Sequence, residues 1–317
     1  MESLNSLIEA FRIPLIRKNK IEDLLFDGYE DDLLKVASQF FPKSNPPKMF
    51  GYFYNRNNTS SDGVYTTSTG RNDNAKSLGI LKKWFLTDKL KLPNNEESSC
   101  VKLDNVSAGD FQVPFFRKYD YNFLEKLSSK PWRSDPLYMF IGDMCRAFRL
   151  DYKSNHKFMN ELDTYRYYSG PKQFDYRNAQ NKCYCHTKKC PPNGLYHLGE
   201  CAKEAPVFLS HPHFLYGDKN LLNKIHGLNP TIQDHEFFID YAKHLSLPIN
   251  INIRLQVNLY IKKNSNIEIM QNLPDDYEFY LPQFWTNTVS FKKKKFFLII
   301  YIFLKFINNN FFYFILK

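Results

Sequence analysis

The clearest chemistry in this sequence comes from its cysteines. There are six, and four of them fall between positions 183 and 201: the full set is Cys100, Cys145, Cys183, Cys185, Cys190 and Cys201. An even number of clustered cysteines is typical of a disulfide framework built in an oxidising compartment. Number and spacing alone do not choose among the possible pairings.

Three sequons for N-linked glycosylation support the same compartment. Their acceptor residues are Asn57, Asn58 and Asn105. Each sequon alone is weak evidence, because the pattern is common by chance. Together with clustered cysteines they indicate the secretory pathway, where both modifications are made.

A zinc site is the competing interpretation of the cysteine cluster. Cys183, Cys185, His186 and Cys190 all carry side chains of zinc-ligand type. Structural zinc sites usually present two ligands, two to four residues apart, on each of two arms. The pair Cys183 and Cys185 lacks a matching second arm, so we predict neither a metal site nor any other cofactor.

The run Ser210-His211-Pro212-His213 places a serine beside histidines, as a hydrolase would. Adjacent residues on a strand point to opposite faces, so Ser210 and His211 are expected to face apart. The sequence also lacks a Gly-x-Ser-x-Gly elbow and a His-Glu-x-x-His helix. We therefore predict no catalytic residues, a structural role for the strand histidine and a solvated loop position for His235.

Composition favours a folded, strand-rich protein. Hydrophobic residues make up 43% of the chain and aromatic residues 17%, which excludes disorder. The net charge is +10, but six lysines lie in residues 291–317: Lys292, Lys293, Lys294, Lys295, Lys305 and Lys317. The rest of the chain carries an ordinary charge without a basic stripe, so no nucleic-acid partner is predicted.

Hydrophobic spacing predicts helices near the start of the chain and strands after it. Apolar residues at helical spacing occur in residues 1–15, 21–26 and 31–37. Aromatic and β-branched runs predict strands at 50–54 and 64–68, joined as a long-looped hairpin, and further strands at 206–210, 236–239 and 253–261. The last run alternates apolar and polar residues, so one face should be buried.

No segment at the start of the chain is a secretory signal or a membrane span, because charged residues interrupt its apolar runs. The last segment, 291–317, uses only Phe, Lys, Leu, Ile, Tyr and Asn. Our hypothesis is that it is translated non-coding sequence. A membrane anchor is the rival interpretation, but Lys305 and three asparagines interrupt the apolar run.

Several segments of the chain resemble the class B scavenger receptors. The strongest is residues 205–216, APVFLSHPHFLY, preceded by the cysteines at 183, 185, 190 and 201. Other segments in the family's order are residues 24–29, 62–65, 190–195, 227–230, 234–236, 239–240 and 254–259. The family includes the croquemort protein, the lysosomal integral membrane protein and the sensory neuron membrane proteins, and this chain resembles an insect-type member.

The resemblance implies a mixed α+β ectodomain with an antiparallel β-barrel-like core, short peripheral helices and disulfide staples. Two membrane spans would flank it, and an apolar tunnel would cross it. Carried over by position, the family pattern pairs Cys100 with Cys183, Cys145 with Cys201, and Cys185 with Cys190. Leu255, Val257 and Leu259 are candidates for lining the tunnel, although filling the core is the plainer role.

By this resemblance, residues 1–285 form a partial ectodomain, incomplete at both ends, and residues 286–317 form a divergent tail. The implied function is that of a membrane scavenger receptor, not an enzyme, which takes up lipids, fatty acids or lipoproteins. Its implied location is the plasma membrane, with the ectodomain outside. Alternatives in the family are a lysosomal membrane receptor and a sensory-neuron co-receptor for lipids or pheromones. An intracellular zinc-binding module is the alternative of another class.

Overall fold

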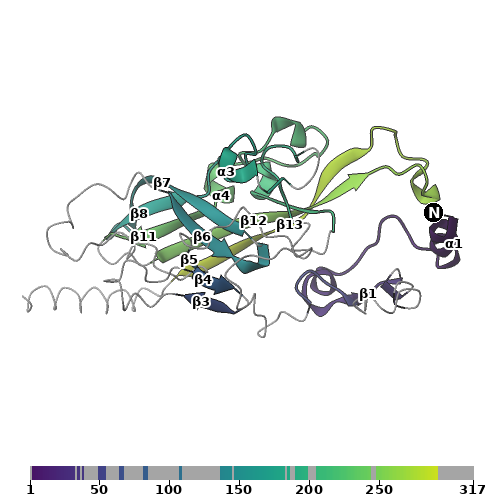
Figure 1. Ribbon diagram of the computed structural model, residues 1–317, viewed down its shortest axis with the longest axis horizontal. Coiled ribbons are helices and arrows are strands. Elements are labelled where there is room, and N and C mark those ends of the chain that lie inside the picture. Colours follow the sequence, from purple (N-terminus) through teal and green to yellow (C-terminus); the bar gives the residue numbers. More distant parts are fainter. Residues whose placement is uncertain are drawn as a thin grey trace, which may run out of the picture. The chain divides into compact units, whose positions relative to one another are not determined.

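The structure is a computed structural model, shown in Figure 1. It describes residues 2–32, 34–35, 38, 49–54, 64–67, 81–84, 107–108, 136–144, 146–182, 184–185, 190–198, 205–243 and 248–291. These residues belong to two compact units. The first comprises Met1–Val64 with Tyr260–Phe279, and the second Tyr65–Leu259 with Tyr280–Lys317.

The described elements that lie wholly in the first unit are short. They are α1 (Glu2–Ala10), the π-helix η1 (Asp23–Asp27), β1 (Tyr29–Glu30), β2 (Met49–Phe50) and the 3-10 helix η9 (Glu268–Met270). The Asn5 amide links α1 to the segment around η9, donating to the carbonyl oxygen of Asn266 at 2.9 Å and accepting from the Glu268 N–H at 3.3 Å. β1 and β2 pair as antiparallel strands.

The second unit contains the main sheet. Its strands are β3 (Tyr65–Thr67), β4 (Leu81–Trp84), β5 (Ser107–Ala108), β6 (Leu137–Ile141), β7 (Arg146–Phe158), β8 (Leu162–Tyr168), β9 (Tyr196–His197), β10 (Val207–Ser210) and β11 (Phe238–Ala242). Two longer strands, β12 (Pro248–Lys262) and β13 (Glu278–Phe291), reach into both units. The helices are α3 (Ala179–Lys182), α4 (Ile232–His235) and the 3-10 turns η6 (Gly142–Met144), η7 (Pro212–Phe214) and η8 (Lys219–Leu221).

Nine strands form one sheet in the order β5-β6-β7-β8-β11-β12-β10-β9, with β13 paired to β12. β5 and β6 are parallel. The pairs β6–β7, β7–β8, β8–β11, β11–β12, β12–β10 and β10–β9 are antiparallel. Figure 1 shows β6, β7, β8, β11 and β12 side by side in one layer, with α3 and α4 above it in that view. β3 and β4 form a separate two-stranded sheet.

The alternation in β12 explains where the core lies. Ile251, Ile253 and Leu255 point to one face and belong to a large buried cluster with Phe148, Tyr167 and other aromatic residues of β6, β7, β8 and β11. Successive side chains of a strand alternate between faces. The intervening residues Asn250, Asn252, Gln256 and Asn258 therefore share the opposite face, and they are buried too.

Hydrogen bonds within that opposite face pair its buried carboxylate and amides. Asp240 accepts two hydrogen bonds from Arg166, at 2.7 and 2.8 Å, and a third from Asn250 at 2.8 Å. Along β12 the Gln256 amide donates to Asn258, which donates in turn to the Ser210 hydroxyl. Burying a polar group is costly unless it is hydrogen-bonded, so these bonds offset the cost of burying this face.

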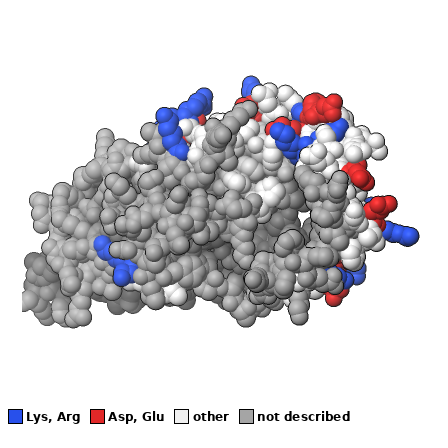
Figure 2. Space-filling model, turned by 45° about the vertical axis from the view of Figure 1, so that its right-hand side comes forward, with Lys and Arg blue, Asp and Glu red and all other residues white. Residues whose placement is uncertain are grey.

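The described surface mixes charges of both signs. On the face shown in Figure 2, acidic and basic side chains lie next to each other over the described residues. Ion pairs with at least one exposed side chain include Lys35–Glu30, Arg177–Asp175 and Lys263–Asp275. Exposed pairs of this kind contribute little to stability and keep the surface soluble.

The helix predicted at residues 1–15 forms, but it ends at Ala10 as α1. Strands predicted at 206–210 and 253–261 form as β10 and the longer β12, whereas the strand predicted at 236–239 begins two residues later as β11. The predicted hairpin of residues 50–54 with 64–68 is wrong. Backbone register pairs β2 with β1 and β3 with β4, and residues 52–54 form a turn.

The fold class is therefore mostly antiparallel β-sheet with a few short helices and a disulfide. The strand order has two ends, β5 and β9, and no pairing joins them in the described part of the chain.

Candidate functional site

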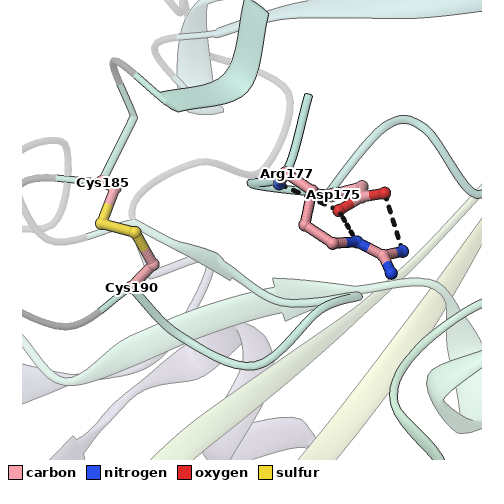
Figure 3. The surroundings of a disulfide bond; sticks show 4 residues. All are labelled: Asp175, Arg177, Cys185 and Cys190. Atoms are coloured by element: carbon pink, nitrogen blue, oxygen red, sulfur yellow. Dashed lines mark hydrogen bonds and ion pairs between the residues drawn. A yellow bond between two sulfur atoms is a disulfide. The ribbon is translucent and has the colours of Figure 1, made fainter. Parts of the chain in front are cut away.

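A disulfide-closed loop connects α3 to β9. Cys185 and Cys190 are joined, with their Cα atoms 5.2 Å apart, as Figure 3 shows. Their sulfurs are bonded to each other and so cannot act as zinc-binding thiolates. The other four cysteines, Cys100, Cys145, Cys183 and Cys201, lie outside the described residues, as do the sequon residues Asn57, Asn58 and Asn105.

An ion pair in the same region joins two neighbours in sequence. Arg177 donates from Nε and Nη2 to the two carboxylate oxygens of Asp175, at 2.8 and 2.9 Å (Figure 3). These hydrogen bonds lower the pKa of Asp175. The charges of the pair therefore offset each other over the pH range in which proteins function.

A pocket of about 450 Å³ opens beside this pair. Its lining residues are Asp175, Tyr176, Arg177, Pro191, Asn193 and Asp218. Two backbone segments cross tightly at its wall: the Asp218 N–H donates to the Asn193 carbonyl at 2.9 Å, and Gly194 (φ +92°) packs directly on the backbone of Gly217. A Cβ atom at Gly194 would overlap the Cα atom of Gly217, so the crossing requires glycine.

In the Ser-His-Pro-His segment Ser210, His211 and Pro212 are buried and His213 is half-buried, and the polar side chains have separate partners. Ser210 Oγ accepts from Asn258 Nδ2 at 3.0 Å, whereas His211 Nε2 lies 3.1 Å from Ser169 Oγ. Burial lowers the pKa of His211 to about 4. Ser210 and His211 therefore do not pair as a nucleophile and a base. Their different partners fit the expectation that the two side chains face apart on the strand.

The position predicted for His235 is wrong. It was expected in a solvated loop, but it ends α4 and is 6% exposed. Its ring stacks on His213 with centroids 4.2 Å apart, and each Nδ1 accepts a backbone N–H, from Thr231 and Asn229 respectively. Burial and the neighbouring His213 lower the pKa of His235.

The candidate tunnel residues lie along β12 at alternate positions. Leu255 is 3% exposed and belongs to the core, Val257 is half-buried and packs against the core, and Leu259 is half-buried. They share a face, as their spacing predicts. Both roles considered for them, lining a tunnel and filling the core, are compatible with this placement.

Two polar clusters were missed from the sequence. Glu236 is 2% exposed, and its carboxylate accepts two hydrogen bonds from Lys153 and one from Tyr216, at 2.6 to 2.7 Å. Arg146 is 1% exposed and lies among aromatic rings. Neither residue stands in a motif of catalytic spacing, so no sequence signal distinguished them from surface charges.

The described residues contain no group of three or more His, Cys, Asp or Glu side chains placed to hold a metal ion. Within the same residues, no helix combines the length and the apolar character that crossing a membrane requires.

Comparison with known proteins extends the argument from the sheet to the whole chain. The model of the CD36 family matches residues 1–316. This chain belongs to the CD36 family. The family consists of non-enzymatic receptors, and its members are membrane proteins of the plasma membrane or the lysosome that bind lipids and lipoproteins in general.

Curated relatives in this family are about a quarter to a third identical to the chain over the aligned regions. Protein peste of Drosophila melanogaster is 30% identical over 80% of the chain, scavenger receptor class B member 1 of Sus scrofa 28% over 76%, and lysosome membrane protein 2 of Homo sapiens 26% over 83%. The aligned regions are 42%, 43% and 50% of these relatives, so the chain spans half their length or less.

Proposed function

We propose that this CD36-family chain is part of the ectodomain of a membrane scavenger receptor that binds lipids, fatty acids or lipoproteins and takes them up. The family match over residues 1–316 carries the proposal. The ectodomain would face the outside of the plasma membrane, and its core strands would belong to a barrel that encloses a path for lipid.

The apolar face of β12 supports the lipid path. Leu255 belongs to, and Val257 packs against, a buried cluster that also contains aromatic residues of β7 and β8, so an apolar molecule at this face would meet hydrocarbon and ring surfaces. Apolar cavities with few polar groups are the usual sites for such ligands. The buried amides of the opposite face bond to one another, which makes that face the less favourable one for lipid.

Enlarging one side chain on the apolar face tests the path. Val257→Phe in the full-length receptor should reduce transfer of a fluorescent fatty acid severalfold while cell-surface abundance stays unchanged, because the added ring would fill the space through which lipid passes. Leu162→Phe is the matched control, since Leu162 is also half-buried but packs against a separate small cluster. Equal transfer by both variants would exclude a path along β12.

A lysosomal receptor is the second candidate, and the similarity to human lysosome membrane protein 2 over 83% of the chain favours it. Cell-surface biotinylation of the full-length protein separates the two locations. A labelled majority supports the surface receptor, whereas an unlabelled protein that is found with lysosomal markers supports the alternative. A sensory-neuron co-receptor would instead require expression confined to such neurons.

A further inference from the structure

The arginine at the start of β7 is buried and has no carboxylate partner among the described residues. Arg146 is 1% exposed, and its Nη2 donates to the Gln173 carbonyl at 2.6 Å and to Asn181 Oδ1 at 2.7 Å. Its Nε and Nη1 atoms are buried and have no hydrogen-bond acceptor among the described residues. A buried charge is costly unless something of opposite sign compensates it.

Aromatic rings supply part of this compensation. The Arg146 guanidinium carbon lies 4.1 Å from the ring centroid of Tyr184, 4.7 Å from that of Tyr196 and 5.3 Å from that of Phe174. Ring faces attract a cation but accept only weak hydrogen bonds from its N–H groups. The rings therefore stabilise the charge and still leave the N–H groups without good acceptors.

Two further unsatisfied donors stand near the arginine. Gln173 is 2% exposed; its Oε1 accepts from the Arg149 N–H, but its Nε2 has no acceptor in the described structure. The buried hydroxyl of Tyr176 has no acceptor for its O–H there either; the backbone N–H of His197 approaches its oxygen and lowers its pKa slightly. Burial raises the pKa of Tyr176 to about 12, so the group remains an O–H donor at physiological pH.

Each of the four groups in this cluster can donate a hydrogen bond and has no acceptor among the described residues, and the cluster's formal charge, on Arg146, is positive. Buried unsatisfied groups are rare in native proteins, and several of one type together call for a specific explanation. Of the three residues, Tyr176 also lines the 450 Å³ pocket. The pocket's two carboxylates and one guanidinium would not draw in an anion over long range, so short-range hydrogen bonds must provide the affinity.

We propose that Arg146, Gln173 and Tyr176 form a buried binding site for a small monovalent anion, either a halide or a carboxylate group. An anion there would accept hydrogen bonds from the guanidinium, the amide and the phenol and would neutralise the buried charge. This site is separate from the proposed lipid path on β12, and its test does not depend on lipid transfer.

Thermal unfolding of the secreted protein in sodium bromide or sodium acetate tests the site. Sodium isethionate, whose anion is bulky, keeps the ionic strength constant. The unfolding midpoint should rise with bromide, acetate or both, because a ligand that binds only the folded state stabilises it by mass action. A response to bromide alone identifies a halide site, and a response to acetate identifies a carboxylate site.

Variants assign the response to the cluster. Arg146→Gln should abolish it, and Tyr176→Phe should weaken the apparent anion affinity about tenfold, as expected for the loss of one hydrogen bond to a charged group. Arg177→Gln, which removes an exposed arginine from the same pocket, should leave the response unchanged. If Arg146→Gln does not fold, Tyr176→Phe carries the test.

An effect of Tyr176→Phe that does not depend on the salt would contradict the proposal. If the site holds no anion, this variant deletes an unsatisfied buried hydroxyl, so it should stabilise the protein equally in every salt. A midpoint that stays constant in bromide and acetate, together with that uniform gain, would mean that the aromatic rings alone accommodate Arg146.

Discussion

Burial controls the protonation of single side chains in the second unit, and His211 shows it most clearly. The ring is 1% exposed and its pKa falls from 6.5 to about 4. The folded protein therefore binds this proton more weakly than the unfolded chain does. The stabilising contribution is complete above pH 6.5, decreases as the pH falls from 6.5 to about 4, and decreases no further below that.

From this shift we expect the free energy of unfolding to fall by about 3 kcal/mol on account of His211 across that interval. His211→Gln should remove this part of the pH dependence, measured by denaturant unfolding at a series of pH values. His226→Gln is the control, because His226 is exposed. An unchanged slope in His211→Gln would show that other groups cause the dependence.

A second prediction for a single residue concerns Asp240, whose carboxylate accepts three hydrogen bonds. It is fully buried and accepts from Arg166 twice and from Asn250 once. Asp240→Asn would remove the charge that faces the Arg166 guanidinium and leave that guanidinium partly buried without its counter-ion. We expect a loss of about 3 to 5 kcal/mol in unfolding free energy.

Asp163→Asn provides the comparison for this prediction. Asp163 lies on β8, as Arg166 does, but its side chain is exposed. Its replacement should change stability by about 0.5 kcal/mol or less. Chemical denaturation of both variants is sufficient, and equal effects would contradict the role given to Asp240.

At the scale of elements, the crossing of the segments before η8 and before β9 depends on glycine. Gly194→Ala would both require φ near +92° from alanine and push its Cβ into the backbone of Gly217. We expect destabilisation by about 3 kcal/mol, measured by thermal or denaturant unfolding.

Gly227→Ala separates the two causes. Gly227 also has a positive φ, +89°, but nothing lies within 4 Å of a Cβ placed there. This variant should therefore lose only the backbone contribution, about 1 kcal/mol. If the two variants lost the same unfolding free energy, the close approach to Gly217 would not contribute to the cost of Gly194→Ala.

Strand periodicity predicted β12 well because its alternation extends over many residues and one face is wholly apolar. The same reasoning failed for the hairpin of residues 50–54 and 64–68. Short aromatic runs can pair with several partners, and the choice depends on backbone pairing with β1 and β4, which lie outside the two aromatic runs.

At the scale of the whole molecule, the disulfide framework is the main untested prediction. Besides the bond between Cys185 and Cys190, peptide mapping of the unreduced secreted protein should recover Cys100 with Cys183 and Cys145 with Cys201. Loops this long restrict the unfolded chain most, so each bond should add about 4 kcal/mol to stability. Alkylation of these four cysteines without prior reduction would contradict the pairing.

Glycan attachment tests the compartment independently. Treatment with an N-glycosidase should lower the apparent mass of the protein expressed in insect cells, and replacing Asn105 with Gln should remove one glycan from it.

The division at residues 285 and 286 also remains a prediction: β13 continues to Phe291, and the family match continues to residue 316. A C-terminal peptide from 291–317 in the native protein would contradict the non-coding hypothesis.

The sequence by itself determined the family and the main strands of the sheet. Motifs such as residues 205–216 and the alternation of β12 depend on the order of neighbours along the chain, and that order is complete in the sequence. Only the tertiary structure decided which polar groups are buried and with what partners. The stacking of His235 on His213, the three donors on Asp240 and the unsatisfied N–H groups of Arg146 all join residues distant in sequence. The cost or gain of burying such groups depends on contacts that no local pattern records.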